Sequence, residues 1–256
     1  MLLVCAASLL VAQRTYRNMP LPPESPLSFF DPPGANKPSE FYFARLAYTD
    51  PYGFLEGERP WQIDSPAAER HFLQGVSRLS NIDARSKEVY VRATDGELFD
   101  YPWLYVVEPG RWDLTPEEAA QLREYLLRGG FIMFDDFHGT AQWSIFQAGM
   151  SKILPDRPIV ELGKEDEVFR VLYDLKPHEQ IPGLQMLYTG QTHEYGGRVP
   201  HWRGVYDDDG RLMVMINFNM DLGDAWEHAD FPEYAERYTA AAYRFGLSYI
   251  IYSMTH

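Results

Sequence analysis

The sequence predicts an α/β fold with a mostly parallel central sheet between helices and a hairpin near the C-terminus. Three observations support this prediction. Short apolar runs alternate with amphipathic helical patterns through residues 41–154, which is typical of strands joined by helical crossovers. The run 103–107 (WLYVV) carries no charged residue, as expected for a strand covered on both faces. An Asp-Gly turn separates two apolar runs around residue 210, which is typical of a hairpin.

The first strand is predicted over residues 41–48 (FYFARLAY), an aromatic and apolar run. Ser65 and Pro66 are suited to open a helix. That helix has an apolar stripe at helical spacing, made of Ala68, Phe72, Val76 and Leu79. The runs 89–93 and 103–107 predict two further strands.

The best-defined helix begins at Thr115. Residues 115–118 (TPEE) form a capping box with proline at the first helical position, and the glycines at 129–130 end the helix. Residues 131–134 (FIMF) then predict a strand, and residues 143–154 predict a further helix.

The C-terminal half is less regular. Short apolar runs at 168–173 and 184–188 predict strands, and the runs 202–206 and 211–218 predict the two strands of the hairpin. The polar segment 219–227 predicts a loop. Residues 232–245 predict a helix that ends before Gly246, whereas residues 247–254 fit either a strand or a continued helix.

The N-terminal 40 residues differ from the rest of the chain. Residues 1–12 (MLLVCAASLLVA) carry no charge, which fits the core of a secretory signal, and they are too few to span a bilayer, which needs about 20 apolar residues. Residues 13–40 include a proline-rich stretch that predicts an extended tether, which leaves 41–256 as one domain. We therefore expect export to the periplasm, with an uncleaved N-terminal segment as the only link to a membrane. The alternative is a buried N-terminal helix.

The chain is acidic, with 37 Asp and Glu against 23 Lys and Arg and a formal net charge of -14. Such a surface repels nucleic acids and anionic lipids, and it suits a small neutral or cationic ligand or an envelope protein as partner. The alternative is that the acidity only keeps the protein soluble. The single cysteine, Cys5, lies in the signal-like segment, which excludes cysteine-nucleophile chemistry in the domain.

The first candidate site is Asp135, Asp136 and His138, directly after a predicted strand. Ligands in open α/β sheets bind beyond the carboxyl ends of strands. Carboxylate and imidazole groups there could perform acid-base catalysis or hold a metal ion. Adjacent residues of an extended chain point to opposite sides, so only one of the two aspartates faces a given cleft. The alternative is that an aspartate caps the next helix and His138 lies at the surface.

The second candidate site follows the next predicted core strand. Asn217 and Asn219 are candidate ligand-binding residues, and Asp221 and Asp224 are candidate metal ligands. Oxygen ligands suit calcium or magnesium, whereas the alternative is a loop closed by local side-chain hydrogen bonds. We expect this acidic turn and the first one to emerge side by side from one edge of the sheet.

Two further residues are candidates for ligand binding. Arg45 lies inside an apolar run, and a buried guanidinium needs a partner, for which Asp135 or Asp136 is expected; an anionic ligand is the functional alternative. His193 lies in the glycine-rich segment 189–197, which either borders a site or forms a surface loop.

Several motifs together resemble the domain of unknown function 4159 family, from about residue 41 to the C-terminus. They are FYFARL at 41–46, Trp61 with Asp64, YPWLY at 101–105, GGF at 129–131, DDF at 135–137 and DLG with Trp226 at 221–226. The resemblance implies a flavodoxin-like three-layer sandwich related to class I glutamine amidotransferases, in exported bacterial proteins. Relatives with glutaminase activity carry a cysteine at a strand-to-helix elbow. The matching junction at 134–139 offers aspartates, so a cysteine-dependent glutaminase is not expected.

Two main functions are compatible with these features, and a third is sugar binding by exposed Trp and Tyr rings that stack on pyranose rings. The first is a non-catalytic binding or scaffold module of the cell envelope. The second is a hydrolase of carbohydrates or amides that uses Asp135, Asp136 or His138, either alone or with a bound divalent cation. No other cofactor is evident from the sequence.

Overall fold

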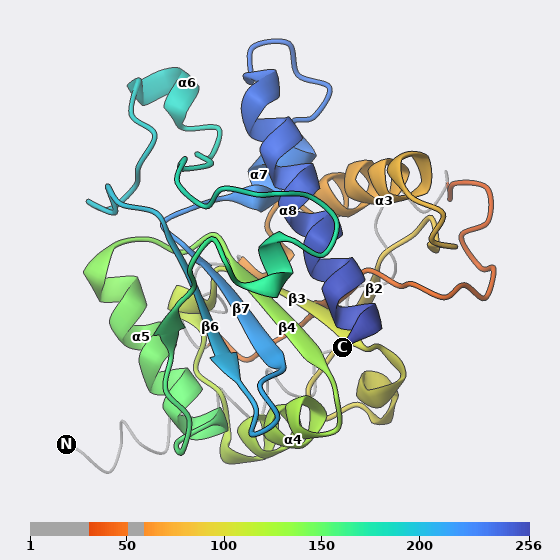
Figure 1. Cartoon of the computed structure of the whole chain (residues 1–256), viewed down its shortest axis with the longest axis vertical. Helices are drawn as coiled ribbons and strands as arrows, with labels where there is room; N and C mark the ends of the chain where they lie inside the picture. Colours follow the sequence, from red (N-terminus) through yellow and green to blue (C-terminus); the bar gives the residue numbers. More distant parts are fainter. Residues whose placement is uncertain (1–30, 51–58) are drawn as a thin grey trace.

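The computed structural model describes residues 31–50 and 59–256, and a seven-stranded sheet in the order β2-β1-β3-β4-β7-β6-β5 lies at its centre (Figure 1). Five strands run parallel to one another: β1 (Ala44–Leu46), β2 (Val89–Val91), β3 (Trp103–Val107), β4 (Phe131–Asp135) and β7 (Leu212–Phe218). The other two are antiparallel to their neighbours: β5 (Val160–Glu161) and β6 (His201–Tyr206). The mostly parallel sheet and the hairpin are therefore confirmed.

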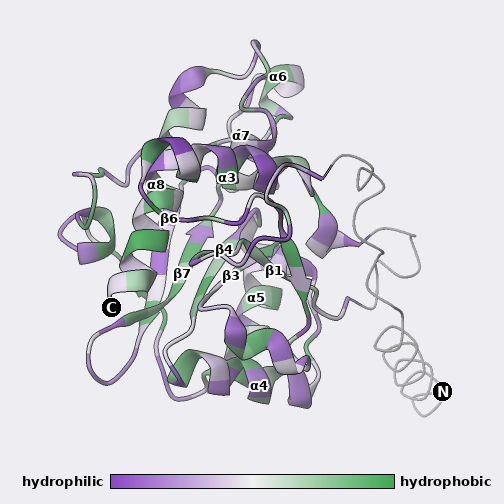
Figure 2. Cartoon of the chain, turned by 90° about the vertical axis from the view of Figure 1, so that its right-hand side faces the viewer, coloured by the Kyte–Doolittle hydropathy of each residue, from purple (hydrophilic) through white to green (hydrophobic). Residues whose placement is uncertain are grey.

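Helices cover both faces of the sheet. One face packs against α3 (Ala67–Leu79), α7 (Leu222–Glu227) and α8 (Glu236–Thr255), and the other against α4 (Pro116–Leu127) and α5 (Gly139–Ile153). Helices α4 and α8 carry both hydrophobic and hydrophilic residues along their length in Figure 2, as expected for helices that bury one side against a sheet. The short helix α6 (Met186–Thr189) lies apart from both layers (Figure 1). Short 3-10 turns complete the described elements: η2 (Pro60–Gln62), η3 (Gly96–Asp100), η4 (Pro109–Arg111) and η5 (Glu167–Phe169).

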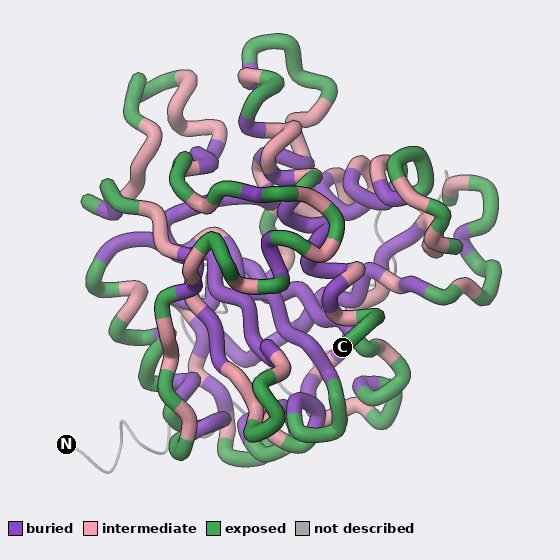
Figure 3. The backbone as a smooth tube through the Cα atoms, viewed as in Figure 1, coloured by how far each residue is buried: buried purple, intermediate pink, exposed green. Residues whose placement is uncertain are grey.

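Strand β3 shows how the sheet joins two hydrophobic cores. Trp103, Tyr105 and Val107 belong to the core under α3, α7 and α8, while Leu104 and Val106 belong to the core under α4 and α5. All five residues are buried, as are the central strands as a group (Figure 3). Alternate side chains of a strand point to opposite faces, so an uncharged run is what a doubly covered strand requires.

Several predictions for the C-terminal half are wrong. The runs 168–173 and 184–188 are not strands; they overlap η5 and α6 instead, because a short apolar run does not distinguish a strand from a helical turn. The predicted loop 219–227 contains α7. Its N-cap is Asp221, whose carboxylate accepts a hydrogen bond from the backbone N–H of Asp224 at 2.7 Å.

Three helix boundaries or faces also differ from prediction. Helix α8 continues through Gly246, where an added Cβ would lie 2.6 Å from the Phe72 ring, so this glycine allows close packing and does not end the helix. Helix α5 begins at Gly139, earlier than the predicted Trp143. Leu79 is 58% exposed and does not belong to the buried stripe of α3.

The predicted signal segment 1–12 and tether residues 13–30 lie outside the described residues. The part of the tether at 31–40 contacts the domain, where Asp31 pairs with Lys87 at 2.9 Å. Within the described part of the chain, no helix combines the length and the apolar character that crossing a membrane needs.

Arg45 is fully buried on β1 and forms an ion pair with Glu69 of α3. Its Nη1 also donates hydrogen bonds to the carbonyl oxygens of Trp61 and Ile63, at 3.1 and 2.7 Å. The guanidinium is therefore held by a carboxylate and two backbone carbonyls, and a role for Arg45 in holding an anionic ligand is not needed to explain its burial.

The expected pairing of Arg45 with Asp135 or Asp136 is wrong, because β3 lies between β1 and β4. Tyr105 of β3 fills the space between them. Its ring lies 5.0 Å from the Arg45 guanidinium, and its hydroxyl donates to Asp135 at 3.1 Å. Helix α3 crosses the same face and brings Glu69 to Arg45 instead.

We predict that Glu69→Ala destabilises the protein by about 3–5 kcal/mol, because it leaves a buried guanidinium without a counter-charge. The double variant Arg45→Met with Glu69→Leu, which removes both charges, should lose less. Urea unfolding of the three proteins measures both effects. A single variant as stable as the wild type would contradict the assigned ion pair.

Candidate functional site

A pocket of about 440 Å³ opens at the carboxyl edge of the parallel strands. Seven acidic side chains line it, together with two imidazoles: Asp64, Glu108, Asp136, Glu194, Asp221, Asp224, Glu227, His138 and His228. No lysine or arginine is among the lining residues. The pocket therefore concentrates the negative charge of the chain at the edge where α/β proteins bind ligands.

Two neighbouring strands, β4 and β7, supply the centre of this pocket. The loops that leave them are joined by a reciprocal pair of backbone hydrogen bonds. The N–H of Asp136 donates to the carbonyl of Met220 at 3.2 Å, and the N–H of Asn219 donates to the carbonyl of Phe137 at 3.0 Å. The expectation that the two acidic turns emerge side by side from one edge is confirmed.

The backbone around the pocket is strained. Among the described residues, five that are not glycine have a positive φ: Asp64, Glu108, Asp136, Tyr195 and Asn219. The first four line the pocket, and Asn219 lies in the loop after β7. A left-handed conformation costs an ordinary residue about 1–2 kcal/mol, and residues in such conformations cluster at functional sites.

Three aspartates from separate loops meet in the pocket. Asp64 precedes α3, Asp136 follows β4 and Asp221 follows β7, and each offers a carboxylate oxygen within 4.8 Å of the other two. Burial raises the pKa of all three well above the usual value, and neighbouring carboxylates add to the effect. Their negative charges are thus poorly compensated by the protein itself.

Asp136 also belongs to a second group, with His138 and Glu194, whose potential ligand atoms lie within 4.8 Å of one another. His138 Nε2 lies 3.1 Å from Asp136 Oδ1, while Nδ1 is buried without a hydrogen-bond partner among the described residues. Burial lowers the pKa of His138 to about 4, so the imidazole is neutral at pH 7.

Asp135, the other predicted catalytic aspartate, is not among the residues that line the pocket. Its Oδ2 accepts hydrogen bonds from the N–H groups of Leu222 and Gly223, at 2.8 and 2.9 Å, and from the Tyr105 hydroxyl. Asp135 thus stabilises the N-terminus of α7. The alternative from the sequence was that an aspartate caps the next helix along the chain, which is α5. Burial raises its pKa to about 7.

Asp224 lies in the pocket with partners of its own. Its Oδ2 accepts a hydrogen bond from the N–H of Leu184 at 2.6 Å, and its Oδ1 lies 3.4 Å from His228 Nε2. Glu227 also pairs with His228, at 3.2 Å. Burial opposes ionisation of Asp224, but these hydrogen bonds leave its pKa below the usual value. Asp224 and Glu227 therefore share one imidazole partner, His228.

The remaining predicted ligand residues do not line the pocket. Asn217 is buried on β7, where its Oδ1 accepts a hydrogen bond from Tyr249 at 3.0 Å. Asn219 instead connects the segments around the pocket. Its side chain accepts a hydrogen bond from the N–H of Gly139 at 2.9 Å and donates one to the carbonyl of Val199 at 2.7 Å. His193 is half-buried beside Glu194, and it is Glu194 that reaches the pocket.

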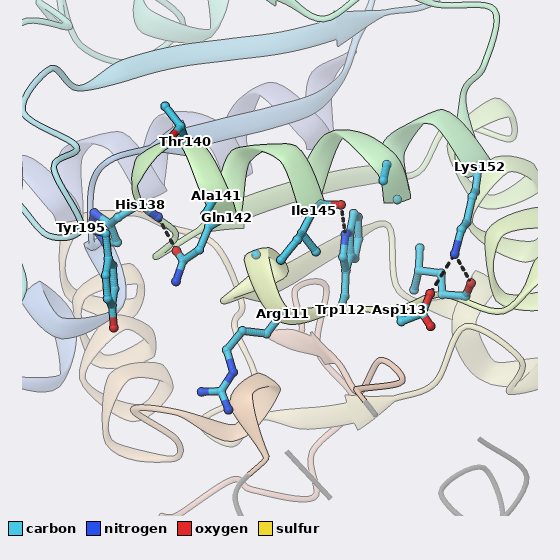
Figure 4. Close-up of a pocket in the computed structure, with 14 residues that line it drawn as sticks. Arg111, Trp112, Asp113, His138, Thr140, Ala141, Gln142, Ile145, Lys152 and Tyr195 are labelled. Carbon is cyan, nitrogen blue, oxygen red and sulfur yellow. Dashed lines mark hydrogen bonds and ion pairs between the residues drawn. The ribbon is translucent and has the colours of Figure 1, made fainter. Parts of the chain in front are cut away.

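A second, more apolar cavity of about 750 Å³ adjoins the acidic pocket (Figure 4). The two share His138, Gln142 and Tyr195. Trp112 and Ile145 contribute apolar surface along helix α5. These three shared residues therefore lie at the boundary between the acidic pocket and the more apolar cavity.

Sequence reasoning missed four acidic residues of the pocket, Asp64, Glu108, Glu194 and Glu227, and the imidazole of His228. Asp64 belongs to a family-like motif with Trp61, which by itself does not indicate a ligand site, and Glu108 follows β3 at the same edge as Asp136. The rule that ligands bind beyond the carboxyl ends of parallel strands could have indicated Glu108. Glu194 had a weaker signal, which was its place in a glycine-rich loop.

We predict that Asp135→Asn weakens the pH dependence of stability in metal-free protein. Because the pKa of Asp135 is raised from 3.8 to about 7 in the folded state, this group favours folding below pH 4 and its contribution is lost as the pH rises towards 7. Asparagine still accepts the hydrogen bonds of α7 without titrating. The loss of unfolding free energy between pH 4 and 7 should be smaller by about 2–4 kcal/mol, measured by urea unfolding. Equal pH dependence in both proteins would refute the assignment.

Comparison with known proteins agrees with the motif resemblance. A search of curated proteins finds no match. The family model described as "Domain of unknown function (DUF4159)" matches residues 42–254. This range covers every strand described above, every helix except the last residue of α8, and all nine acidic or imidazole side chains of the pocket. The chain therefore belongs to the DUF4159 family.

Proposed function

We propose that this protein is a divalent-cation-dependent hydrolase whose ion is held by Asp64, Asp136 and Asp221. The observation that carries the proposal is the convergence of these carboxylates, from three loops, within 4.8 Å of one another. Carboxylate oxygens are the preferred ligands of magnesium, calcium and manganese. A divalent cation would also balance charges that the surrounding protein leaves uncompensated.

The surroundings of the three aspartates support a catalytic use. The pocket is larger than one ion needs, at about 440 Å³, and leaves room for water and part of a substrate. A bound cation would lower the pKa of a coordinated water. Glu108 lines the same pocket, and burial raises its pKa to about 7, so its carboxylate can accept a proton from that water.

The charge of the pocket also restricts the substrate. Glu108, Glu194 and Glu227 add negative charge around the three aspartates, so a phosphate or carboxylate group next to the ion would be repelled. Neutral or cationic substrates, such as amides and glycosides, are therefore favoured. The adjoining cavity along α5, with Trp112 and Ile145, offers apolar surface for the rest of such a molecule.

Export to the cell envelope is part of the proposal, supported by the uncharged apolar segment 1–12. A non-catalytic binding module of the envelope would use the same cation without turnover. The two functions share the ion and differ only in activity, so they are separated by the assays below.

We predict that magnesium, manganese or calcium raises the thermal stability of chelator-treated protein. An ion that binds only the folded state contributes about 2.7 kcal/mol at a concentration 100 times its dissociation constant. Asp221→Asn and Asp64→Asn should lose this gain, because each removes a ligand. The exposed Asp174→Asn is the matched control and should keep it. Differential scanning fluorimetry with cation titrations measures the effect.

The same preparations, tested on chromogenic amides and glycosides, should show turnover that a chelator abolishes and the cation restores. Asp221→Asn should lower the rate by at least about tenfold. Cation binding with no turnover across the panel would favour the binding module, and no response to any cation would remove the proposed function.

A further inference from the structure

We propose that the pocket holds two divalent cations, bridged by the carboxylate of Asp136. The inference rests on the proposed function and extends it from one ion to a pair. Asp136 is the only residue common to the groups Asp64–Asp136–Asp221 and Asp136–His138–Glu194. A carboxylate has two oxygens, and two-ion hydrolases hold their ions about 3.5–4 Å apart.

His138 provides evidence for the second ion that is independent of the acidic residues. It is only 3% exposed, yet it lines the pocket, and its Nδ1 has no hydrogen-bond partner among the described residues. Buried polar atoms are nearly always paired. A metal ion bound to Nδ1 would give this atom a partner, while Nε2 keeps its hydrogen bond to Asp136.

Glu194 is held in place by the packing of its loop. Gln180 Nε2 donates to the carbonyl oxygens of Gly197 and Asn219, at 2.8 and 2.7 Å. Close approach requires glycine at two points: an added Cβ on Gly139 would lie 2.4 Å from the Tyr195 carbonyl oxygen, and one on Gly197 would lie 2.1 Å from Asn219 Oδ1. The loop after β7 and the start of α5 therefore fix the position of Glu194 next to His138.

The two proposed ion positions differ in their ligand atoms, so they should prefer different metal ions. The group with Asp64 and Asp221 offers only carboxylate oxygens, which suit calcium. The group with His138 and Glu194 includes an imidazole nitrogen, which calcium disfavours and transition metals accept. Manganese binds mixed carboxylate and histidine sets in paired-ion proteins, so it is expected at both positions, and calcium at the first alone.

The third acidic group, Asp224, Glu227 and His228, is not part of the proposal. Its imidazole pairs with both carboxylates, at 3.4 and 3.2 Å, and Asp224 also accepts a hydrogen bond from Leu184. Both carboxylates therefore have a partner, whereas Nδ1 of His138 has none among the described residues. Glu227→Gln should therefore leave the number of bound ions unchanged.

The test is the stoichiometry of ions on the full chain, measured by equilibrium dialysis with elemental analysis. Wild-type protein should bind about two manganese ions and about one calcium ion. Glu194→Gln should keep one manganese ion, and Asp136→Asn should lose both. Asp174→Asn, with an exposed carboxylate outside the pocket, is the matched control. Circular dichroism identifies any variant that fails to fold.

Electron paramagnetic resonance of the manganese-loaded protein gives a second readout. Two bridged manganese ions couple magnetically, so the wild type should lack the six-line spectrum of an isolated ion, and Glu194→Gln should restore it. A single manganese ion that depends on Asp221 but not on Glu194 would overturn the inference and leave the proposed function standing. Absence of any bound ion would overturn both.

Discussion

The reciprocal pair of backbone hydrogen bonds between the loops after β4 and β7 is the constraint on which the pocket depends. It ties Asp136 to Met220 and Asn219 to Phe137. Both Asp136 and Asn219 have a positive φ where these bonds form, and Asp136 lines the pocket while Asp135 stays in the strand. Two adjacent aspartates are thereby divided between two tasks. Asp135 holds α7, and Asp136 faces the ligand space.

The order of the sheet explains why this edge gathers so much charge. Strands β3, β4 and β7 are consecutive neighbours, and each is followed within three residues by a pocket carboxylate, namely Glu108, Asp136 and Asp221. Burial alone would favour protonation of these groups. Folding the loops together therefore has an electrostatic cost at neutral pH, and a bound cation would remove much of it.

The fold was largely predictable from the sequence because its signals are local. The capping box at Thr115 and the uncharged run at 103–107 depend only on neighbouring residues, and both elements are observed. The acidic turns after β4 and β7 were also identified, since the rule for parallel strands places them at one edge. The chain's membership of the DUF4159 family is in line with the motifs. The finer flavodoxin-like assignment stays a prediction.

The missing parts of the site come from contacts between distant residues, which local patterns do not encode. Glu69 is the partner of Arg45 because α3 crosses β1, and no spacing in the sequence indicates that crossing. Glu194 reaches His138 because Gly139 and Gly197 allow two loops to touch. In both cases a side chain that looks like an ordinary surface acid acquires its role from packing. Sequence patterns therefore identify the site residues that directly follow strands. The residues that complete the site are identified only from the folded positions of the loops.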